Sequence, residues 1–225
     1  MTENEKAVPG RCGSLKNISE YEGFRLLAGY GIPTVKSALA HDWQEVRRAG
    51  EAIGYPVVLK RSSPQISHKN ERGFVEVDLR GESELERAFH RMGENAPEGS
   101  QEYLVQEMVR GGRELTAGMI RDPQFGPCVM FGLGGIFTEV LGDVVFRKAP
   151  LSERDAAEML DDIKGRKILG AVRGMPAVNR DSLIACLIAV GRIGLERDDI
   201  MAIDINPLIV RGSEPVAVDA LVELR

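Results

Sequence analysis

The stretch Ile203-Asp204-Ile205-Asn206-Pro207-Leu208-Ile209-Val210 combines the pattern of a buried strand with two oxygen-bearing side chains. Asp204 and Asn206 are two residues apart, so in a strand they lie on the same face of the sheet. Pro207 has no N–H and is expected to break the hydrogen-bonding ladder directly after them. Asp219 ends the next apolar run, which we expect to form the paired strand.

Side-chain oxygens gathered from two strands suit Mg²⁺, which binds few protein oxygens together with nucleotide phosphates. We therefore predict a magnesium site formed by Asp204, Asn206 and Asp219. The structural alternative is an Asx turn between the strands. That turn accounts for Asn206 but not for apolar runs that lead to oxygen ligands on both strands, so we favour the magnesium site.

The run Tyr55-Pro56-Val57-Val58-Leu59-Lys60 predicts another buried strand, and this one ends in a cation. A lysine in this place can reach the phosphates of a nucleotide as a point charge. The alternative is a lysine whose stem covers the strand end while its ammonium group lies in water. The position of Lys60 by itself does not exclude that alternative.

Residues 62–73 form a long connection between this strand and the next, which we place at about 74–79. Loops of about 12 residues are uncommon unless they serve a function. The loop contains hydroxyl groups, cations and a glycine, including Ser63 and Gly73, and these residue types suit contact with phosphate. His68 could act as a base, a ligand or a covalent phosphoryl carrier. An exposed loop histidine is the simpler alternative.

Two glutamates, Glu107 and Glu114, flank the segment 108–113. Gln106-Glu107-Met108 leaves a predicted strand, so its backbone could present an edge to an adenine. Either glutamate could then hold ribose hydroxyls or magnesium. A hairpin with solvated carboxylates explains the same residues.

The segment Phe131-Gly132-Leu133-Gly134-Gly135-Ile136 is a glycine-rich turn after an apolar strand. Glycines such as Gly134 and Gly135 let the backbone approach an anion closely. The segment is neither a P-loop nor a complete GxGxxG motif, and a simple turn fits it equally well. Arg147 and Lys148 follow a further strand and add positive charge nearby in the sequence.

The composition of the 225 residues excludes several classes of protein. The net charge of −5 argues against nucleic acid or an anionic membrane as the main partner. The three cysteines, Cys12, Cys128 and Cys186, are widely spaced, which predicts neither a disulfide framework nor a zinc site. No apolar run reaches the roughly 20 residues that span a bilayer, and the N-terminus lacks the apolar core of a signal peptide. We expect a cytoplasmic protein with reduced thiols.

The expected architecture is α+β, with two lobes and a cleft between them. We expect a flexible arm over 1–17, a first lobe over 18–98 and a second lobe over 99–225, with a hinge near Pro97. Capping signals predict helices that begin at Ser19, Asp42 and Ser83, and further helices near 153–162 and 181–193. Strand-like runs at 200–205, 207–211 and 215–220 are expected to close the second lobe.

In this order the motifs resemble the ATP-grasp fold, and specifically the β subunits of ADP-forming (NDP-forming) acetyl-CoA synthetases, relatives of succinyl-CoA synthetases. The resemblance covers about residues 18–222, and its most specific part is Asp122-Pro123-Gln124-Phe125-Gly126-Pro127 followed by Gly132-Leu133-Gly134-Gly135. The other residues that carry it are Glu20-Tyr21-Glu22, Tyr30-Gly31-Ile32-Pro33, Tyr55–Lys60, Ser63-Pro64, His68-Lys69, Val105–Met108, Gly112-Arg113-Glu114, Phe146–Leu151 and Asp204–Leu208.

The resemblance implies a reversible ligase reaction in which acyl-CoA, phosphate and ADP give an acid, CoA and ATP. In this family a separate α subunit binds CoA, forms the acyl phosphate and carries its own phosphohistidine. The β subunit passes the phosphoryl group to ADP through a second histidine, which His68 matches. The resemblance therefore implies a hetero-oligomer, α₂β₂, in which acyl-CoA or acyl phosphate arrives through the partner.

The resemblance also assigns roles to single residues. Lys60 matches the lysine that contacts nucleotide phosphates, and Gln106-Glu107-Met108 match the segment that faces the base. Asn206 and Asp219 match magnesium ligands. Asp204 would either support these ligands from outside the metal site or act as an alternative ligand. The other expected contacts to nucleotide or to transferring phosphate are Ser63, Gly73, Glu107, Glu114, Gly134, Gly135 and Arg147.

Two other functions remain open at this point. A different ATP-grasp ligase would join a carboxylate to an amine or thiol directly through an acyl phosphate, with no need for His68. A nucleotide-binding module without catalysis would agree with Arg72, which stands where family members usually carry glycine. The acyl group and the choice between ADP and GDP are not specified by these motifs.

Overall fold

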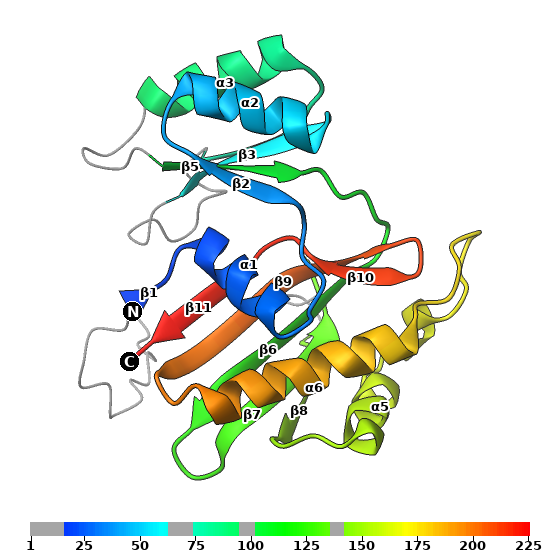
Figure 1. Cartoon of the computed structure of the whole chain (residues 1–225). Coiled ribbons are helices and arrows are strands. Elements are labelled where there is room, and N and C mark those ends of the chain that lie inside the picture. Colours follow the sequence, from blue (N-terminus) through cyan, green and yellow to red (C-terminus); the bar gives the residue numbers. More distant parts are fainter. Residues whose placement is uncertain (1–15, 63–73, 95–101, 136–141) are drawn as a thin grey trace, which may run out of the picture.

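Two β-sheets with helices on their faces form the frame of the chain in the computed structural model (Figure 1). The structure describes residues 16–62, 74–94, 102–135 and 142–225. All strand pairs within the two sheets are antiparallel. Cys128 and Cys186 are both free thiols. Among the described helices, none is long and apolar enough to cross a membrane.

The smaller sheet has four strands in the order β2-β5-β3-β4. They are β2 (Ser37–Ala40), β3 (Val57–Ser62), β4 (Val75–Leu79) and β5 (Glu102–Glu107), and helices α2 (Trp43–Ile53) and α3 (Glu82–Glu94) cover one face (Figure 1). Leu59, Leu85 and Val105 are fully buried in the core of this layer pair. Because side chains alternate along a strand, Lys60 points to the opposite face, away from these helices.

The larger sheet has seven strands in the order β1-β11-β9-β6-β7-β8, with β10 paired to β9. Phe131, Met159 and Ile193 are fully buried between this sheet and the helices on one of its faces. The strands are β1 (Lys16–Asn17), β6 (Glu114–Asp122), β7 (Gly126–Leu133), β8 (Val144–Lys148), β9 (Ile200–Arg211), β10 (Glu214–Ala217) and β11 (Leu221–Leu224), and the covering helices are α5 (Glu153–Asp162), the 3-10 helix η1 (Arg166–Leu169) and α6 (Arg180–Glu196).

Helix α1 (Glu20–Gly29) begins at Ser19, as the capping signal predicts. The Ser19 hydroxyl accepts a hydrogen bond from the Glu22 N–H, and the Glu22 carboxylate accepts one from the Ser19 N–H. The apolar side of the helix carries Phe24 and Leu27, which belong to the core of the larger sheet. The first turn of α1 lies near the smaller sheet, so its side chains can meet those of β3.

The grouping of elements into sheets differs from the predicted lobes of 18–98 and 99–225 in two places. Helix α1 packs on the larger sheet, where a Cβ on Gly23 would contact Ala220 and Val222. Strand β5 lies in the smaller sheet, between β2 and β3, although it follows the predicted boundary. Both differences arise from long-range packing and pairing. The predicted hinge and most of the predicted N-terminal arm lie outside the described residues.

Strand β9 runs through Pro207, so the two strands expected at 200–205 and 207–211 are one. The expected break in the ladder is confirmed, because the regular pairing with β6 is interrupted at this proline. Along β9 the partners of β6 change from Ile205, opposite Ala117, to Leu208, opposite Leu115. Three steps on β9 thus match two steps on β6, which is a β-bulge. A bulge leaves one residue outside the regular ladder, and that is where a residue without an N–H is tolerated.

Candidate functional site

The ammonium group of Lys60 lies where the two sheets meet. Its Nζ atom donates hydrogen bonds to Glu20 Oε1 at 2.5 Å and to the Val218 carbonyl at 3.0 Å. Asp219 Oδ2 is 3.6 Å away. The Lys60 side chain is 7% exposed and that of Glu20 is 2% exposed. Lys60 is therefore buried and does not extend into water, which excludes the structural alternative.

Two opposing effects act on the pKa of Lys60. Burial alone lowers it, because the charged form loses its hydration. The carboxylates of Glu20 and Asp219 act in the other direction and raise the pKa above its ordinary value. The lysine is consequently charged at neutral pH, as a phosphate ligand must be.

Gln106 reaches the same place from β5. It lies opposite Val58 in the register of the smaller sheet, on the face that carries Lys60. Its Nε2 donates to the Val218 carbonyl at 3.2 Å, so Val218 accepts hydrogen bonds from two residues of the smaller sheet. The Gln106 Oε1 is buried and has no hydrogen-bond partner among the described residues. An orphaned buried acceptor at a predicted ligand site is compatible with a donor group on a ligand.

In the segment Gln106-Glu107-Met108, which is expected to face the base, two backbone N–H groups donate hydrogen bonds to other backbone groups of the protein. The Glu107 N–H donates to the Lys36 carbonyl at 2.8 Å, and the Met108 N–H donates to the Pro56 carbonyl at 3.3 Å. The Glu107 carboxylate accepts from Arg211 Nη1 at 2.6 Å, across the junction of the sheets. Arg211 was not singled out from the sequence. Its contact shows Glu107 as an inter-sheet ion-pair partner in this structure.

Glu114, Gly134, Gly135 and Asn206 come together at one end of β6. The Gly134 N–H donates to the Glu114 carbonyl at 2.8 Å, and the Gly135 N–H donates to Asn206 Oδ1 at 3.4 Å. Gly135 has a φ of +62°, and a Cβ on it would lie 2.1 Å from the Glu114 carboxylate. The left-handed backbone favours glycine there, and a larger residue would also force the Glu114 carboxylate to move.

The three predicted magnesium ligands lie on β9 and just before β11. Asp204 is paired with Leu221 in the sheet register, two residues from Asp219. Burial and the negative charge of Asp219 together raise the pKa of Asp204. The two carboxylates thus repel each other, and a divalent cation between them would remove that cost. Among the described residues no group of three or more His, Cys, Asp or Glu side chains could hold a metal ion, so the candidate donor set is two carboxylates and one amide.

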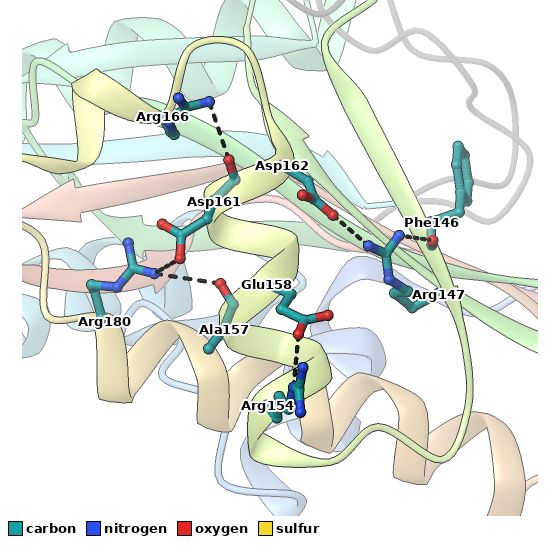
Figure 2. A network of polar contacts seen from close by, with 9 residues as sticks. All are labelled: Phe146, Arg147, Arg154, Ala157, Glu158, Asp161, Asp162, Arg166 and Arg180. Carbon is teal, nitrogen blue, oxygen red and sulfur yellow. Dashed lines mark hydrogen bonds and ion pairs between the residues drawn. The ribbon is translucent and has the colours of Figure 1, made fainter.

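Arg147 is not among the described residues that contact Lys60. Its side chain points to Asp162 and to the Phe146 carbonyl (Figure 2). Arg147 lies opposite Val129 in the β7–β8 register, and Val129 is buried under α6 next to Gly191. Its side chain therefore lies on the helix-covered face, where it forms an ion pair with Asp162 of α5 and donates to the Phe146 carbonyl. The sequence could not distinguish the two faces, because basic residues occur at both neighbouring positions of β8.

Replacing Arg147 by glutamine is expected to leave phosphoryl transfer within about twofold of the wild-type rate. The ion pair with Asp162 is about half exposed, and such pairs contribute roughly 0–1 kcal/mol to stability. Steady-state kinetics and chemical denaturation of R147Q measure both quantities. A fall of more than about tenfold in kcat would place Arg147 in the reaction, as the sequence predicted.

His68, Ser63 and Gly73 lie outside the described residues, so their predicted roles stay predictions. The structure adds one residue that the sequence did not single out, Glu20. In the sequence it stands in the first turn of a capped helix, where acidic residues are common for local reasons. No local signal distinguishes it from exposed Glu22, whereas its burial and its contact with Lys60 do so.

The comparisons with known proteins agree with the predicted family. The ATP-grasp domain model matches residues 13–224. The β subunit of acetate–CoA ligase [ADP-forming] I from Pyrococcus furiosus is 42% identical over 208 residues, which are 90% of each chain. A longer ligase from Archaeoglobus fulgidus, acetate–CoA ligase [ADP-forming] I, is also 42% identical, but the match spans 30% of its length.

Solved structures extend the comparison to the fold. The dinucleotide-forming acetyl-coenzyme A synthetase 1 of Ca. Korarchaeum cryptofilum, in complex with coenzyme A and Ca-AMPCP, superposes with a TM-score of 0.90 at 43% identity. The match covers 93% of this chain and 94% of that one. Another structure of that enzyme holds Mg-AMPPCP, with its phosphohistidine segment pointing towards the nucleotide-binding site. The chain has the ATP-grasp fold and belongs to the family of ADP-forming acetate–CoA ligase β subunits.

Proposed function

We propose that this chain is the nucleotide-binding subunit of an ADP-forming acyl-CoA synthetase. It transfers a phosphoryl group between a histidine and ADP or ATP, within the reversible reaction of acyl-CoA, phosphate and ADP to acid, CoA and ATP. The observation that supports this most directly is the buried, charged Lys60 opposite Asp219, at the junction of two sheets. Family membership indicates the reaction, and the charged residues at this junction are where we propose that it takes place.

Phosphoryl transfer depends mainly on positioning and on neutralisation of charge. In the proposal Lys60 donates to a phosphate oxygen, and the orphaned Oε1 of Gln106 accepts from the ligand. Asn206 and Asp219 hold Mg²⁺, with Asp204 as a further ligand. When bound, that ion would screen the phosphate charges. Glu114 and the backbone of Gly134 and Gly135 border the same region.

His68 is the proposed phosphoryl carrier. A histidine has an ordinary pKa of about 6.5, so its neutral, nucleophilic form is abundant at neutral pH. In the ATP-forming direction a β-phosphate oxygen of ADP attacks the phosphorus of the phosphohistidine. The N–P bond breaks as the O–P bond forms. The imidazole nitrogen that loses the phosphoryl group takes up a proton from solvent, which restores neutral histidine.

The acyl half of the reaction is assigned to a partner. Relatives of the same length are named β subunits, whereas longer relatives contain this region as about 30% of one chain. We propose that a CoA-binding α subunit supplies the remainder, in an α₂β₂ assembly in the cytoplasm. Acyl phosphate formed on that subunit delivers the phosphoryl group.

The test is intact-mass analysis of the purified chain after brief incubation with Mg²⁺ and ATP at neutral pH. An acid-labile phosphate is expected on the wild type and not on His68→Ala. His41→Ala and His90→Ala are matched controls, because these exposed histidines are the other two of the chain, and both variants should keep the label.

A label that survives in H68A would contradict the proposed carrier. If no variant is labelled, the incubation is repeated with a cognate α subunit and acyl-CoA. Absence of transfer in that mixture, with nucleotide still bound, would instead indicate a binding module without catalysis.

A further inference from the structure

The hydrogens of the Lys60 ammonium group are directed at protein acceptors. An ammonium group has three donors and no acceptor. Two donors go to Glu20 at 2.5 Å and to the Val218 carbonyl at 3.0 Å, and Asp219 lies within ion-pair distance of the third. A phosphate oxygen that binds Lys60 must therefore take the place of one of these acceptors.

The three acceptors are not equivalent as competitors. Val218 offers a neutral carbonyl, which lacks the full Coulombic attraction of a carboxylate for the ammonium group. Asp219 is at 3.6 Å and its side chain is 45% exposed, so water weakens its attraction. Glu20 combines the shortest contact with a side chain that is 2% exposed. It is the strongest competitor of a phosphate oxygen for Lys60.

Glu20 also reaches Lys60 from the other sheet. It begins α1, whose apolar side packs on the larger sheet, whereas Lys60 lies on β3 of the smaller sheet. The ion pair thus connects the smaller sheet to the larger sheet at the proposed nucleotide site. Exchange of Glu20 for a phosphate would change the contact between the sheets at the moment of binding.

We infer that Glu20 is a positioning residue that competes with nucleotide phosphate for Lys60. Its carboxylate holds the ammonium group at the junction of the sheets, and the nucleotide binds by displacing this carboxylate. The inference rests on the proposed role of Lys60 as the phosphate ligand. In this inference Glu20 weakens the binding of nucleotide, and weaker binding favours release of the nucleotide product.

The test is isothermal titration of Mg-ADP into Glu20→Gln. Glutamine keeps the size of the side chain but replaces a charged acceptor with a neutral one, so Mg-ADP is expected to bind about tenfold more tightly. A purely structural role would have the opposite effect, because loss of a stabilising contact weakens binding. Glu22→Gln is the matched control on the same helix, since glutamine preserves the capping box, and its Kd should stay within about twofold.

Two further variants keep the test decisive. Glu20→Asp retains the charge but shortens its reach, and it is expected to bind Mg-ADP about threefold more tightly even if E20Q proves unstable. In the double variant E20Q/K60M the tightening must disappear, because no ammonium group remains to be released. Tightening that persists in the double variant would mean that Glu20 acts by general repulsion, which would overturn the inference.

The outcomes separate this inference from the proposed function. Binding of Mg-ADP by the wild type with equal or weaker binding by E20Q and E20D would overturn the inference alone. A wild type that binds no Mg-ADP at millimolar concentration would overturn the nucleotide-binding function and the inference with it.

Discussion

Replacement of Lys60 by methionine is expected to lower the free energy of unfolding by about 3–5 kcal/mol and to weaken Mg-ADP binding about a hundredfold. The first effect arises because Glu20, whose side chain is 2% exposed, would lose the ammonium group that it contacts at 2.5 Å. Breaking a buried pair by removing one partner costs far more than the pair contributes as a whole. The second effect is the loss of one charge-assisted contact to phosphate.

Urea denaturation and Mg-ADP titration of K60M measure the two effects separately. Lys36→Met is the matched control, because Lys36 is exposed and its change should cost little stability. The double variant K60M/E20Q should recover most of the lost stability, since it removes both charges of the buried pair, but it should not recover nucleotide affinity. A destabilisation below about 1 kcal/mol in K60M would show that Glu20 is not held as a buried carboxylate.

Replacement of Arg113 by methionine is expected to lower the free energy of unfolding by about 3–4 kcal/mol. Arg113 is 1% exposed, and its guanidinium group donates to four backbone carbonyls. The acceptors are Ile168, Gly170, Pro176 and Gly212. Methionine fills much of the volume but leaves these carbonyls without their donor. These bonds are partly buried, so water can enter and each acceptor that loses its donor costs roughly 1 kcal/mol, the low end of the range for buried groups.

Hydrogen exchange locates this effect within the molecule. In R113M the amides of 166–178 should exchange much faster, because Arg113 ties this irregular segment to the turn between β9 and β10. Arg113→Lys keeps the charge but offers fewer donors in a less rigid arrangement, so an intermediate loss is expected. Arg110→Met is the control: its ion pair with Asp78 is exposed, and it should cost less than about 1 kcal/mol. Equal stability of R113M and R110M would contradict the structural role of Arg113.

Most helix starts were predictable because their signals act over three residues. The start predicted at Ser83 is wrong, because α3 begins at Glu82 and Ser83 lies inside its first turn. Asp42 accepts from the Glu45 N–H at the start of α2, and Asn179 accepts from the Ser182 N–H at the start of α6. Such contacts form within one turn of the chain, so the neighbouring residues contain all the information. The family could also be recognised, because recognition requires only that the motifs occur in a fixed order along the sequence. It does not require knowledge of their contacts in the folded chain.

Several features of the site could not be predicted in this way. Glu20 and Lys60 are 40 residues apart, and nothing in either local sequence favours their pairing. The side of the sheet on which Arg147 lies depends on the register of β8 against β7, where a shift of one residue exchanges the two faces. The place of β5 in the smaller sheet depends likewise on its pairing with β2 and β3.

By itself, the sequence determined the family, most helix starts and the residue types of the proposed nucleotide site: a lysine at a strand end, two carboxylates and an amide. The tertiary structure alone decided that Glu20 binds Lys60, that Pro207 lies in a bulge within β9, and that Arg147 belongs to the helix-covered face. The physical reason is the range of the interactions. Caps and alternation act between near neighbours, whereas a buried ion pair and a strand register exist only after distant segments have packed together.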